Sequence, residues 1–312
     1  MMKTRATRIL VTGAAGQLGT ELANALRERH GNAAVIATDI RGGNPLNVMD
    51  KIALHRMVID EGITEIYHLA AMLSASGEQS PLVAWDLNMQ GLINVLEIAK
   101  AHALRVFWPS SIAVFGAHID RTFTRQFSIL EPATVYGISK ASGELWCKYY
   151  FEKYGVDVRS LRYPGLISYS APPGGGTTDY AVDIFLHAAK GEVYTCFLKP
   201  MTTLPMLYMP DAVRATLELM SAPADTLTVR TSYNLQGVSV RPLEFEAHIR
   251  ARLPNFRVNY LADFRQRIAD TWPQGLDDGY ARRDWGWKPQ FDLPSIVEDM
   301  LKNLLKSEPE KK

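Results

Sequence analysis

Short apolar runs alternate with longer helical patterns along the first two-thirds of the chain. Runs rich in β-branched and aromatic residues predict strands at 8–13, 34–40, 65–71, 105–111 and 158–164. Helical patterns begin between them, near Gly16, Asp50, Pro81 and Thr134. Because strands that alternate with helices form βαβ units around a parallel sheet, we expect an α/β fold with a doubly wound, Rossmann-type sheet.

The later part of the chain carries patterns that look like additions to this sheet. Segment 168–181, SYSAPPGGGTTDYA, predicts a long loop of the kind that often forms a lid. Further patterns predict a strand and a helix within 206–220, a strand at 232–237, and helices near 242–253 and 293–306. We expect one domain from residues 1–167 joined by 203–237, and a smaller C-terminal lobe and tail from 168–202 and 238–312.

Composition limits the possible partners. Lys and Arg number 34 against 33 Asp and Glu, a net charge of +1 that disfavours nucleic acid and membrane surfaces. No apolar run approaches the roughly 18 residues of a membrane helix, and the start resembles no signal peptide. Cys147 and Cys196 are too few for a disulfide framework or a zinc site. We expect a cytoplasmic protein that binds a small molecule and no metal, with a frayed tail at 306–312.

A glycine-rich turn follows the first predicted strand. The motif TGAAGQLG places Gly13, Gly16 and Gly19 at three-residue steps, where a helix begins. This context lets backbone N–H groups and a helix N-terminus approach a pyrophosphate, although a tight turn without a ligand would need the same glycines. Asp39 ends the second predicted strand, where a carboxylate can accept hydrogen bonds from ribose hydroxyls.

The residues near Asp39 bear on the choice of cofactor. A carboxylate at this position repels a 2′-phosphate, so the sequence favours NAD over NADP. Arg41 is more readily interpreted as a loop arginine that stacks on adenine than as a phosphate ligand.

A second group of residues indicates proton transfer. Tyr136 and Lys140 form Tyr-x-x-x-Lys in VYGISK, so both side chains lie on one face of a predicted helix. Ser111 ends the fourth predicted strand, at the edge of a doubly wound sheet where ligands bind. A nearby ammonium favours the phenolate of a tyrosine whose ordinary pKa is about 10, so Tyr136 can act as a base at an alcohol that Ser111 holds. The alternative is a buried tyrosine beside a surface lysine.

These motifs together resemble the extended short-chain dehydrogenase/reductase family, which includes NAD-dependent epimerases and dehydratases. TGAAGQLG, HLAA, PSSIAVFG, YGISK and RYPGLI stand in the family's order, and YMPDAVRATLEL and DWGWKPQFDL extend the resemblance over nearly the whole chain. The resemblance implies that Tyr136, Lys140 and Ser111 are catalytic. It also implies that NAD is held by Gly13, Gly16, Gln17, Leu18, Gly19, Asp39, Ile40, Arg41, Asn47, Val48, Leu69, Ala70, Ala71, Asn88, Tyr136, Lys140, Tyr163 and Leu166.

One segment narrows the resemblance further. PPGGGTTDYAVDIF, together with Ser74, is similar to the corresponding region of family members that oxidise the 3-hydroxyl of L-threonine to 2-amino-3-ketobutyrate. The similarity implies that Thr177, Thr178, Ser111 and Tyr136 also lie near the amino acid and that Trp272 closes the site. It further implies a homodimer formed through helices near 81–102 and 134–154.

Some of these residues have plainer interpretations. Hydroxyls such as Ser74 and the two threonines commonly cap helices in loops, and Trp272 could pack between lobes. His68 fits a core histidine, and Asn88 fits a structural hydrogen bond from its helix across to the sheet. Asn47 stands where the family usually has aspartate, so its contact with adenine would be weaker.

Two other functions remain open at this stage. An NDP-sugar 4-epimerase or dehydratase would use the same Ser, Tyr and Lys and return NAD unchanged. Its diphosphate substrate is poorly matched by the GGGTTDYA loop, which has no basic residues. A catalytically silent NAD(P)-sensing protein would not need the complete catalytic set, which this chain has.

Overall fold

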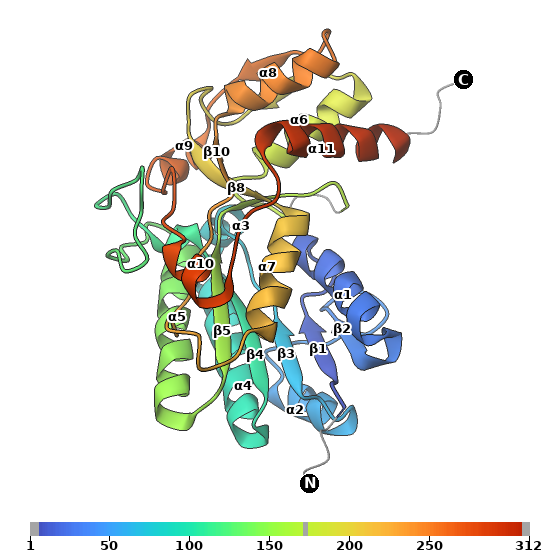
Figure 1. The fold of residues 1–312 in the computed structure, drawn as a ribbon, viewed down its shortest axis with the longest axis vertical. Helices are drawn as coiled ribbons and strands as arrows, with labels where there is room; N and C mark the ends of the chain where they lie inside the picture. The colour runs from blue at the N-terminus through green and yellow to red at the C-terminus, as the bar shows by residue number, and fades with distance from the viewer. Residues whose placement is uncertain (1–5, 171–173, 308–312) are drawn as a thin grey trace.

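The computed structural model describes residues 6–170 and 174–307, and residues 1–5, 171–173 and 308–312 lie outside the described part. Its centre is a parallel sheet with the strand order β2-β1-β3-β4-β5-β9 (Figure 1). These strands are β1 (Ile9–Thr12), β2 (Val35–Thr38), β3 (Glu65–His68), β4 (Arg105–Ser111), β5 (Val158–Tyr163) and β9 (Tyr233–Asn234). The strand order reverses beside β1, which opens a crevice at the carboxyl ends of β1 and β3.

Helices cover both faces of this sheet, which confirms the predicted doubly wound fold. Helices α1 (Gln17–His30), α7 (Met209–Ser221) and α10 (Gly279–Trp285) share a hydrophobic core with one face. Helices α2 (Lys51–Asp60), α4 (Pro81–His102) and α5 (Val135–Tyr154) share a core with the other. Leu92, Leu96 and Ala99, at three- and four-residue spacing on α4, form an apolar stripe that is fully buried in that second core.

The predicted helix starts agree with the structure because each has a local physical cause. Gly16 precedes α1, and Pro81 is the first residue of α4, where its missing N–H costs no hydrogen bond. Asp50 and Thr134 are N-caps whose side chains accept from the backbone N–H groups of Ala53 and Gly137, at 2.9 and 3.0 Å.

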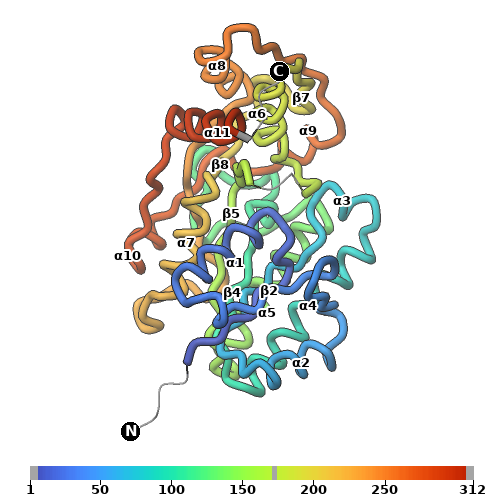
Figure 2. The backbone as a smooth tube through the Cα atoms, turned by 90° about the vertical axis from the view of Figure 1, so that its right-hand side faces the viewer, coloured from blue at the N-terminus to red at the C-terminus, as the bar shows by residue number. Residues whose placement is uncertain are grey.

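A smaller lobe lies beyond the carboxyl ends of the central strands, at the top of Figures 1 and 2. It contains a three-stranded sheet with the order β10-β8-β6 and a two-stranded sheet of β11 and β7. Its strands are β6 (Gly165–Ile167), β7 (Tyr194–Cys196), β8 (Leu204–Tyr208), β10 (Val238–Val240) and β11 (Val258–Tyr260). Its helices are α6 (Tyr180–Lys190), α8 (Pro242–Arg252), α9 (Phe264–Ala269) and α11 (Leu293–Ser307). A third hydrophobic core holds these elements together.

The predicted strand 158–164 is confirmed as β5, one residue shorter than expected, whereas the predicted strand in 206–220 joins a different sheet. The run 158–164 ends in the central sheet at Tyr163, and after Pro164 the chain continues as β6 in the smaller sheet. The predicted strand in 206–220 is β8, which pairs with β6 and β10 rather than with the central sheet. Only α7 and β9 of the 203–237 region return to the central sheet. Both runs are continuously buried, so hydrophobicity alone did not indicate which sheet they join.

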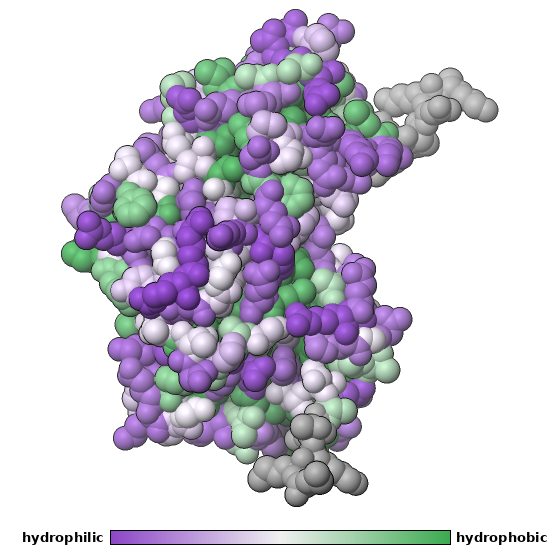
Figure 3. All heavy atoms as spheres, in the orientation of Figure 1, coloured by the Kyte–Doolittle hydropathy of each residue, from purple (hydrophilic) through white to green (hydrophobic). Residues whose placement is uncertain are grey.

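The face of the molecule over α7 and α10 is covered mainly by hydrophilic residues, with apolar residues scattered among them (Figure 3). Among the described residues, no helix combines the length and the apolar character needed to cross a membrane. Cys147 and Cys196 are both buried and free.

Candidate active site

The turn between β1 and α1 is packed so tightly that it requires glycine. Gly13 has a φ of 70°, and a Cβ atom there would lie 2.6 Å from the backbone nitrogen of Ala70. A Cβ atom at Gly19 would lie 2.2 Å from the carbonyl oxygen of Gly13. This packing brings α1 directly against the turn, so that the helix N-terminus faces the crevice.

The start of α1 has unused donors. Gly16 provides no side-chain cap, and the first turn contains no acidic residue. The side-chain nitrogen of Gln17 is buried without a hydrogen-bond partner. An anion at this position would accept hydrogen bonds from these groups and be favoured by the helix dipole.

Asp39 lies at the end of β2, beside the glycine turn. Its carboxylate accepts hydrogen bonds from the backbone N–H groups of Ala15, at 3.0 Å, and Arg41, at 3.4 Å. Asn47, on the same side of the crevice, accepts from the backbone N–H of Met49 at 3.0 Å. Asp39 therefore stands where a ribose would approach the turn. The side-chain oxygen of Asn47 already accepts one hydrogen bond within its own turn, and a ligand would share this acceptor.

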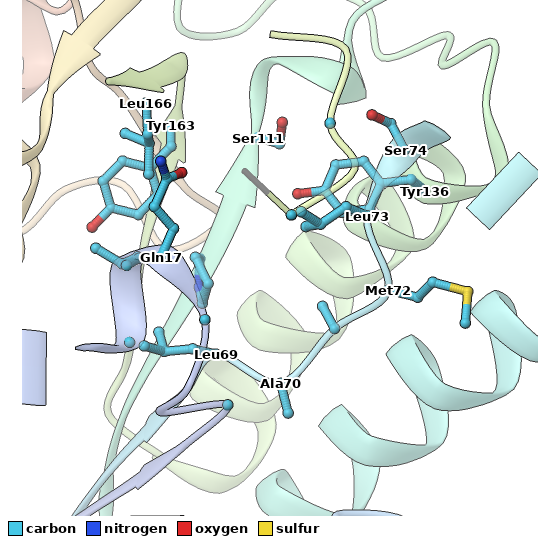
Figure 4. Close-up of a pocket in the computed structure, with 18 of the residues that line it drawn as sticks. Gln17, Leu69, Ala70, Met72, Leu73, Ser74, Ser111, Tyr136, Tyr163 and Leu166 are labelled. Atoms are coloured by element: carbon cyan, nitrogen blue, oxygen red, sulfur yellow. The ribbon is translucent and has the colours of Figure 1, made fainter. Parts of the chain in front are cut away.

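A cavity of about 590 Å³ runs from the glycine turn along the carboxyl edge of the sheet to the smaller lobe. Every predicted site residue except Asn88 lines it. In the view of Figure 4, Gln17, Tyr163 and Leu166 appear on the left, Ser111 and Tyr136 further right, and Leu69 and Ala70 below them, and all of these residues line the cavity. Residues that were named from separate parts of the sequence thus line one common cavity.

Ser111 and Tyr136 lie together at the far end of the cavity (Figure 4). Ser111 is the last residue of β4, and its Oγ atom accepts from the backbone N–H of Ala113 at 3.2 Å. Tyr136 lies in the first turn of α5, and Lys140 follows one turn later on the same face. The Lys140 Nζ atom donates to the carbonyl oxygen of Pro109 at 2.6 Å and lies 5.5 Å from the centre of the Tyr136 ring.

Burial dominates the protonation of these groups. It raises the pKa of Tyr136 to about 12, although a hydrogen bond from Ser111 lowers the value in part. Burial also lowers the pKa of Lys140 to about 7, against the attraction of Glu144. The expected stabilisation of the phenolate by lysine is therefore outweighed by burial in the protein without ligand.

The predicted substrate residues connect two separate segments. The hydroxyls of Ser74, which begins α3 (Ser74–Gln79), and Thr177 lie 3.2 Å apart, and both side chains are buried. A Cβ atom at Gly165 would lie 2.7 Å from the Thr178 methyl group, so Thr178 packs directly on the start of β6. Trp272 lines the same end of the cavity and is 4% exposed, which places it in both the cavity wall and the core of the smaller lobe.

Two residues singled out from the sequence lie behind the cavity. The Asn88 side chain bonds to both the backbone nitrogen and oxygen of Met72, at 2.8 and 3.1 Å, and to the Ser139 hydroxyl. It therefore holds the wall segment after β3 to α4 and α5, and does not line the cavity. His68 bonds to the Thr12 hydroxyl at 2.8 Å, and burial lowers its pKa to about 3.

The structure also identifies residues that sequence reasoning missed. Met72, Leu73, Gly165 and Asp179 line the cavity. The hydrophobic residues gave no signal in the sequence, because an apolar side chain before a short helix is ordinary. Asp179 did have one: an acidic residue directly after two threonines in the glycine-rich segment.

A buried ion pair supports the catalytic helix from behind. Glu144, one turn after Lys140 on α5, forms a bidentate pair with Arg162 of β5 at 2.6 and 2.8 Å. Its Oε1 atom also accepts from the Ser110 hydroxyl of β4 at 2.6 Å. Neither charged side chain is more than 4% exposed. This pair connects α5 to the two strands whose ends form the site.

The parallel sheet, the glycine turn and the cavity at the carboxyl edge define a dinucleotide-binding protein of the Rossmann type. The unpartnered nitrogen of Gln17, the open start of α1 and Asp39 fit a dinucleotide with its pyrophosphate at the helix and a ribose at the carboxylate. Among the described residues, no group of three or more His, Cys, Asp or Glu side chains is arranged to hold a metal ion.

Residues 9–236 match the model of the NAD dependent epimerase/dehydratase family, and the chain belongs to that family. Its membership confirms both the resemblance drawn from the motifs and NAD as the cofactor.

Several relatives have more specific descriptions. The chain is 46% identical to mitochondrial L-threonine 3-dehydrogenase of Sus scrofa over 94% of its own length and 82% of that protein. It is 55% identical to the solved holo form of a GalE-like L-threonine dehydrogenase from Cupriavidus necator, with a TM-score of 0.94 and coverage of 95% and 99%. A monomeric L-threonine 3-dehydrogenase from a metagenome database, solved in its apo form, is 46% identical, with a TM-score of 0.94 and coverage of 96% and 99%.

Proposed function

We propose that this protein oxidises the 3-hydroxyl of L-threonine with NAD⁺ and forms 2-amino-3-ketobutyrate. One observation carries the proposal: Ser111, Tyr136 and Lys140 open into the same cavity as the hydroxyl-lined segment that holds Thr177 and Thr178. A proton-accepting group and a polar pocket for a small alcohol therefore share one space next to the glycine turn. The threonine dehydrogenases among its relatives support this choice of substrate.

Ser111 and Tyr136 have separate roles at the substrate hydroxyl. Ser111 hydrogen-bonds the substrate oxygen, and Tyr136 accepts the hydroxyl proton as the C3–H bond breaks. When bound, NAD⁺ supplies a hydride acceptor whose positive ring also favours the phenolate of Tyr136. The proton thus leaves O3 for Tyr136, and the electron pair of the C3–H bond leaves with the hydride. The ammonium of Lys140 orients the ribose next to the nicotinamide and adds positive charge near the phenolate.

The two parts of the fold serve the two ligands in this proposal. The central sheet with its flanking helices forms the part that holds NAD, and the smaller lobe, which includes β6 and β8, forms the part that holds the amino acid. Trp272 and the Gly174–Gly176 segment lie on the substrate side of the cavity. Their position supports a role in enclosing threonine.

NADH formation tests the proposal. Purified protein with NAD⁺ and L-threonine is followed by the ultraviolet absorbance of NADH, beside NADP⁺ and UDP-sugar controls. The proposal predicts steady accumulation with NAD⁺ and L-threonine alone, because Asp39 disfavours a 2′-phosphate. Turnover of a UDP-sugar without NADH accumulation would instead support a sugar-nucleotide epimerase.

We also propose a cytoplasmic homodimer formed through α4 and α5. These packed helices carry large apolar side chains exposed to solvent, which a second copy would cover. They are Leu82, Val83 and Trp85 of α4 and Leu145, Trp146 and Tyr149 of α5. The monomeric relative makes oligomeric state a property to be measured for this chain.

A further inference from the structure

Asp179 is a carboxylate at the substrate end of the cavity, next to Thr178. The other carboxylate in the cavity wall, Asp39, belongs to the glycine turn at the opposite end. An acidic group is costly to place in a partly enclosed wall unless it has a partner. The environment of Asp179 therefore bears on what the cavity binds.

The position of Asp179 in the chain would suggest a helix cap. It directly precedes α6, yet its side chain makes no capping hydrogen bond to that helix. Its Oδ2 atom turns back instead and accepts from the backbone N–H groups of Gly175, at 2.8 Å, and Gly176, at 2.7 Å. These bonds use one carboxylate oxygen and leave Oδ1 without a hydrogen-bond donor among the described residues.

No cation in the described part of the chain forms an ion pair with Asp179. Arg265, which lowers the pKa of Asp179 slightly, is itself paired with Asp263 at 2.7 Å. Lys140, the cation at the catalytic end of the cavity, donates to the Pro109 carbonyl oxygen. Burial raises the pKa of Asp179 to about 6, so the carboxylate is still ionised at neutral pH. Asp179 thus places a negative charge in the cavity wall, and no cationic side chain of the described residues is paired with it.

L-threonine would supply that counter-ion. The amino acid has an α-ammonium group on the carbon next to the reacting C3, and an ammonium requires acceptors when it leaves water. Thr178 and one member of the bonded Ser74–Thr177 pair have hydroxyl protons that can be donated to its carboxylate, whereas Asp179 is the ionised acceptor at this end. The cavity wall therefore offers an anionic partner for the ammonium group of the substrate and neutral donors for its carboxylate.

We propose that Asp179 binds the α-ammonium group of the substrate and makes the site selective for 3-hydroxy amino acids over 3-hydroxy acids without an amino group. The inference rests on the proposed threonine oxidation and extends it to the class of substrate. It also gives the Gly175 and Gly176 N–H groups a function: they hold the carboxylate in place while Oδ1 faces the ligand.

The test compares Asp179→Asn with the wild-type protein and with Asp183→Asn as a matched control. Asp183 lies one turn further along α6, is also partly buried, and does not line the cavity. Two quantities are measured for each protein: the KM for L-threonine, and the inhibition constant of 3-hydroxybutyrate, which lacks the amino group. NAD⁺ binding, followed by tryptophan fluorescence, shows that each variant is folded.

Loss of a charge-assisted contact should raise the KM for L-threonine roughly tenfold or more in Asp179→Asn. The inhibition constant of 3-hydroxybutyrate should stay within about twofold, as should both values in Asp183→Asn, because no contact to an ammonium is lost. An unchanged KM, or equal weakening of both ligands, would overturn the proposal and leave Asp179 as a loop-positioning residue.

A wild-type measurement tests the inference without any variant. If 3-hydroxybutyrate binds the unaltered enzyme as tightly as L-threonine does, the ammonium contributes nothing and the inference is wrong. If L-threonine is not oxidised at all, the proposed function itself fails, which the same assay distinguishes by the absence of NADH.

Discussion

In the proposed reaction the chemistry depends most on Tyr136, whose surroundings determine how readily its phenol loses a proton. Its hydroxyl lies beside Ser111 in a buried wall, where burial raises the pKa of the phenol to about 12. Burial also lowers the pKa of Lys140 to about 7, so this lysine is only partly charged at neutral pH. The phenolate therefore depends on the positive charge that oxidised NAD adds when it binds.

Replacing Tyr136 by Phe should abolish turnover and leave NAD⁺ affinity nearly unchanged. The substitution removes the proton acceptor but none of the contacts around the glycine turn. Steady-state kinetics and a fluorescence titration with NAD⁺ measure the two effects separately. Retention of more than about a tenth of kcat, a loss of less than roughly 1.4 kcal/mol of barrier stabilisation, would argue against Tyr136 as the base.

The raised pKa of Tyr136 also predicts how activity depends on pH. Below that pKa the phenolate fraction rises about tenfold per pH unit, so kcat/KM for L-threonine should rise from neutral to mildly alkaline pH. The rise should be less steep than this limit, because Lys140, with a pKa of about 7, loses its favourable charge over the same range. A pH profile that is flat or falls between these conditions would contradict the assignment.

Residues with a distinctive chemical pattern could be predicted from the sequence, and the others could not. Gly13, Asp39 and Ser111 stand at the ends of β1, β2 and β4, so the sheet brings them to one edge, and Tyr136 has a recognisable spacing to Lys140 on α5. Asp179 was missed even though it directly follows two threonines in the glycine-rich segment, because an aspartate before a helix is usually a cap. Only the structure shows that its side chain turns away from α6.

At the scale of elements, α5 matters most because it carries Tyr136 and Lys140. Two buried polar contacts hold α5 against the central sheet: the ion pair between Glu144 and Arg162, and the hydrogen bond from Ser110 to the same carboxylate. Ser110 precedes Ser111 on β4, so one buried carboxylate connects the helix that carries Tyr136, the proposed base, with the strand that ends at Ser111, the proposed substrate ligand. Rigid support of this kind keeps catalytic groups in productive geometry.

Substitution of Glu144 by Ala should destabilise the protein by about 3–5 kcal/mol, because it leaves the Arg162 guanidinium buried without its counter-ion. Denaturant unfolding of the two proteins gives this difference. Glu152→Ala is the matched control: Glu152 is exposed on the same helix and pairs with Lys148 at 3.5 Å, so its loss should change the free energy of unfolding by less than about 1 kcal/mol. Equal effects of the two substitutions would show that the buried pair contributes no more than a surface pair.

Element boundaries show where sequence patterns stop being informative. Helix starts were predictable because capping residues and Pro81 are local signals. The division of VRSLRYPGLI between β5 and β6 was not, since every residue of the run except Leu166 is buried and only tertiary pairing assigns each half to a sheet. Helix α3 was also missed: it has six residues and no apolar stripe.

At the scale of the whole molecule, the smaller lobe lies beyond the carboxyl edge of the central sheet (Figure 1). The cavity extends from the glycine turn of the sheet to this lobe. Fold class and cofactor could be predicted from the order of strands, helices and motifs. The pairing of the smaller sheets depends on contacts between distant segments, such as β11 with β7, which no local pattern encodes.

The exposed apolar side chains of α4 and α5 predict a dimer interface, and charged side chains introduced there should prevent the dimer from forming. Leu145 and Trp146 together replaced by Glu should convert the protein to a monomer, because buried charges without partners oppose association. Sedimentation velocity measures the change. Leu261, which is 72% exposed in the smaller lobe, provides the control, since Leu261→Glu should leave the dimer intact. A wild-type protein that sediments as a monomer at every concentration tested would contradict the proposed interface.

The central claim is that a hydride leaves C3 of L-threonine for NAD⁺ while Tyr136 takes the hydroxyl proton. The most direct test uses L-threonine with deuterium at C3, followed by mass spectrometry of the reduced cofactor and the product. We predict deuterated NADH in equal amount to 2-amino-3-ketobutyrate or the aminoacetone that forms from it by decarboxylation. Deuterium retained in the amino acid or released to water, with no labelled NADH, would contradict the account.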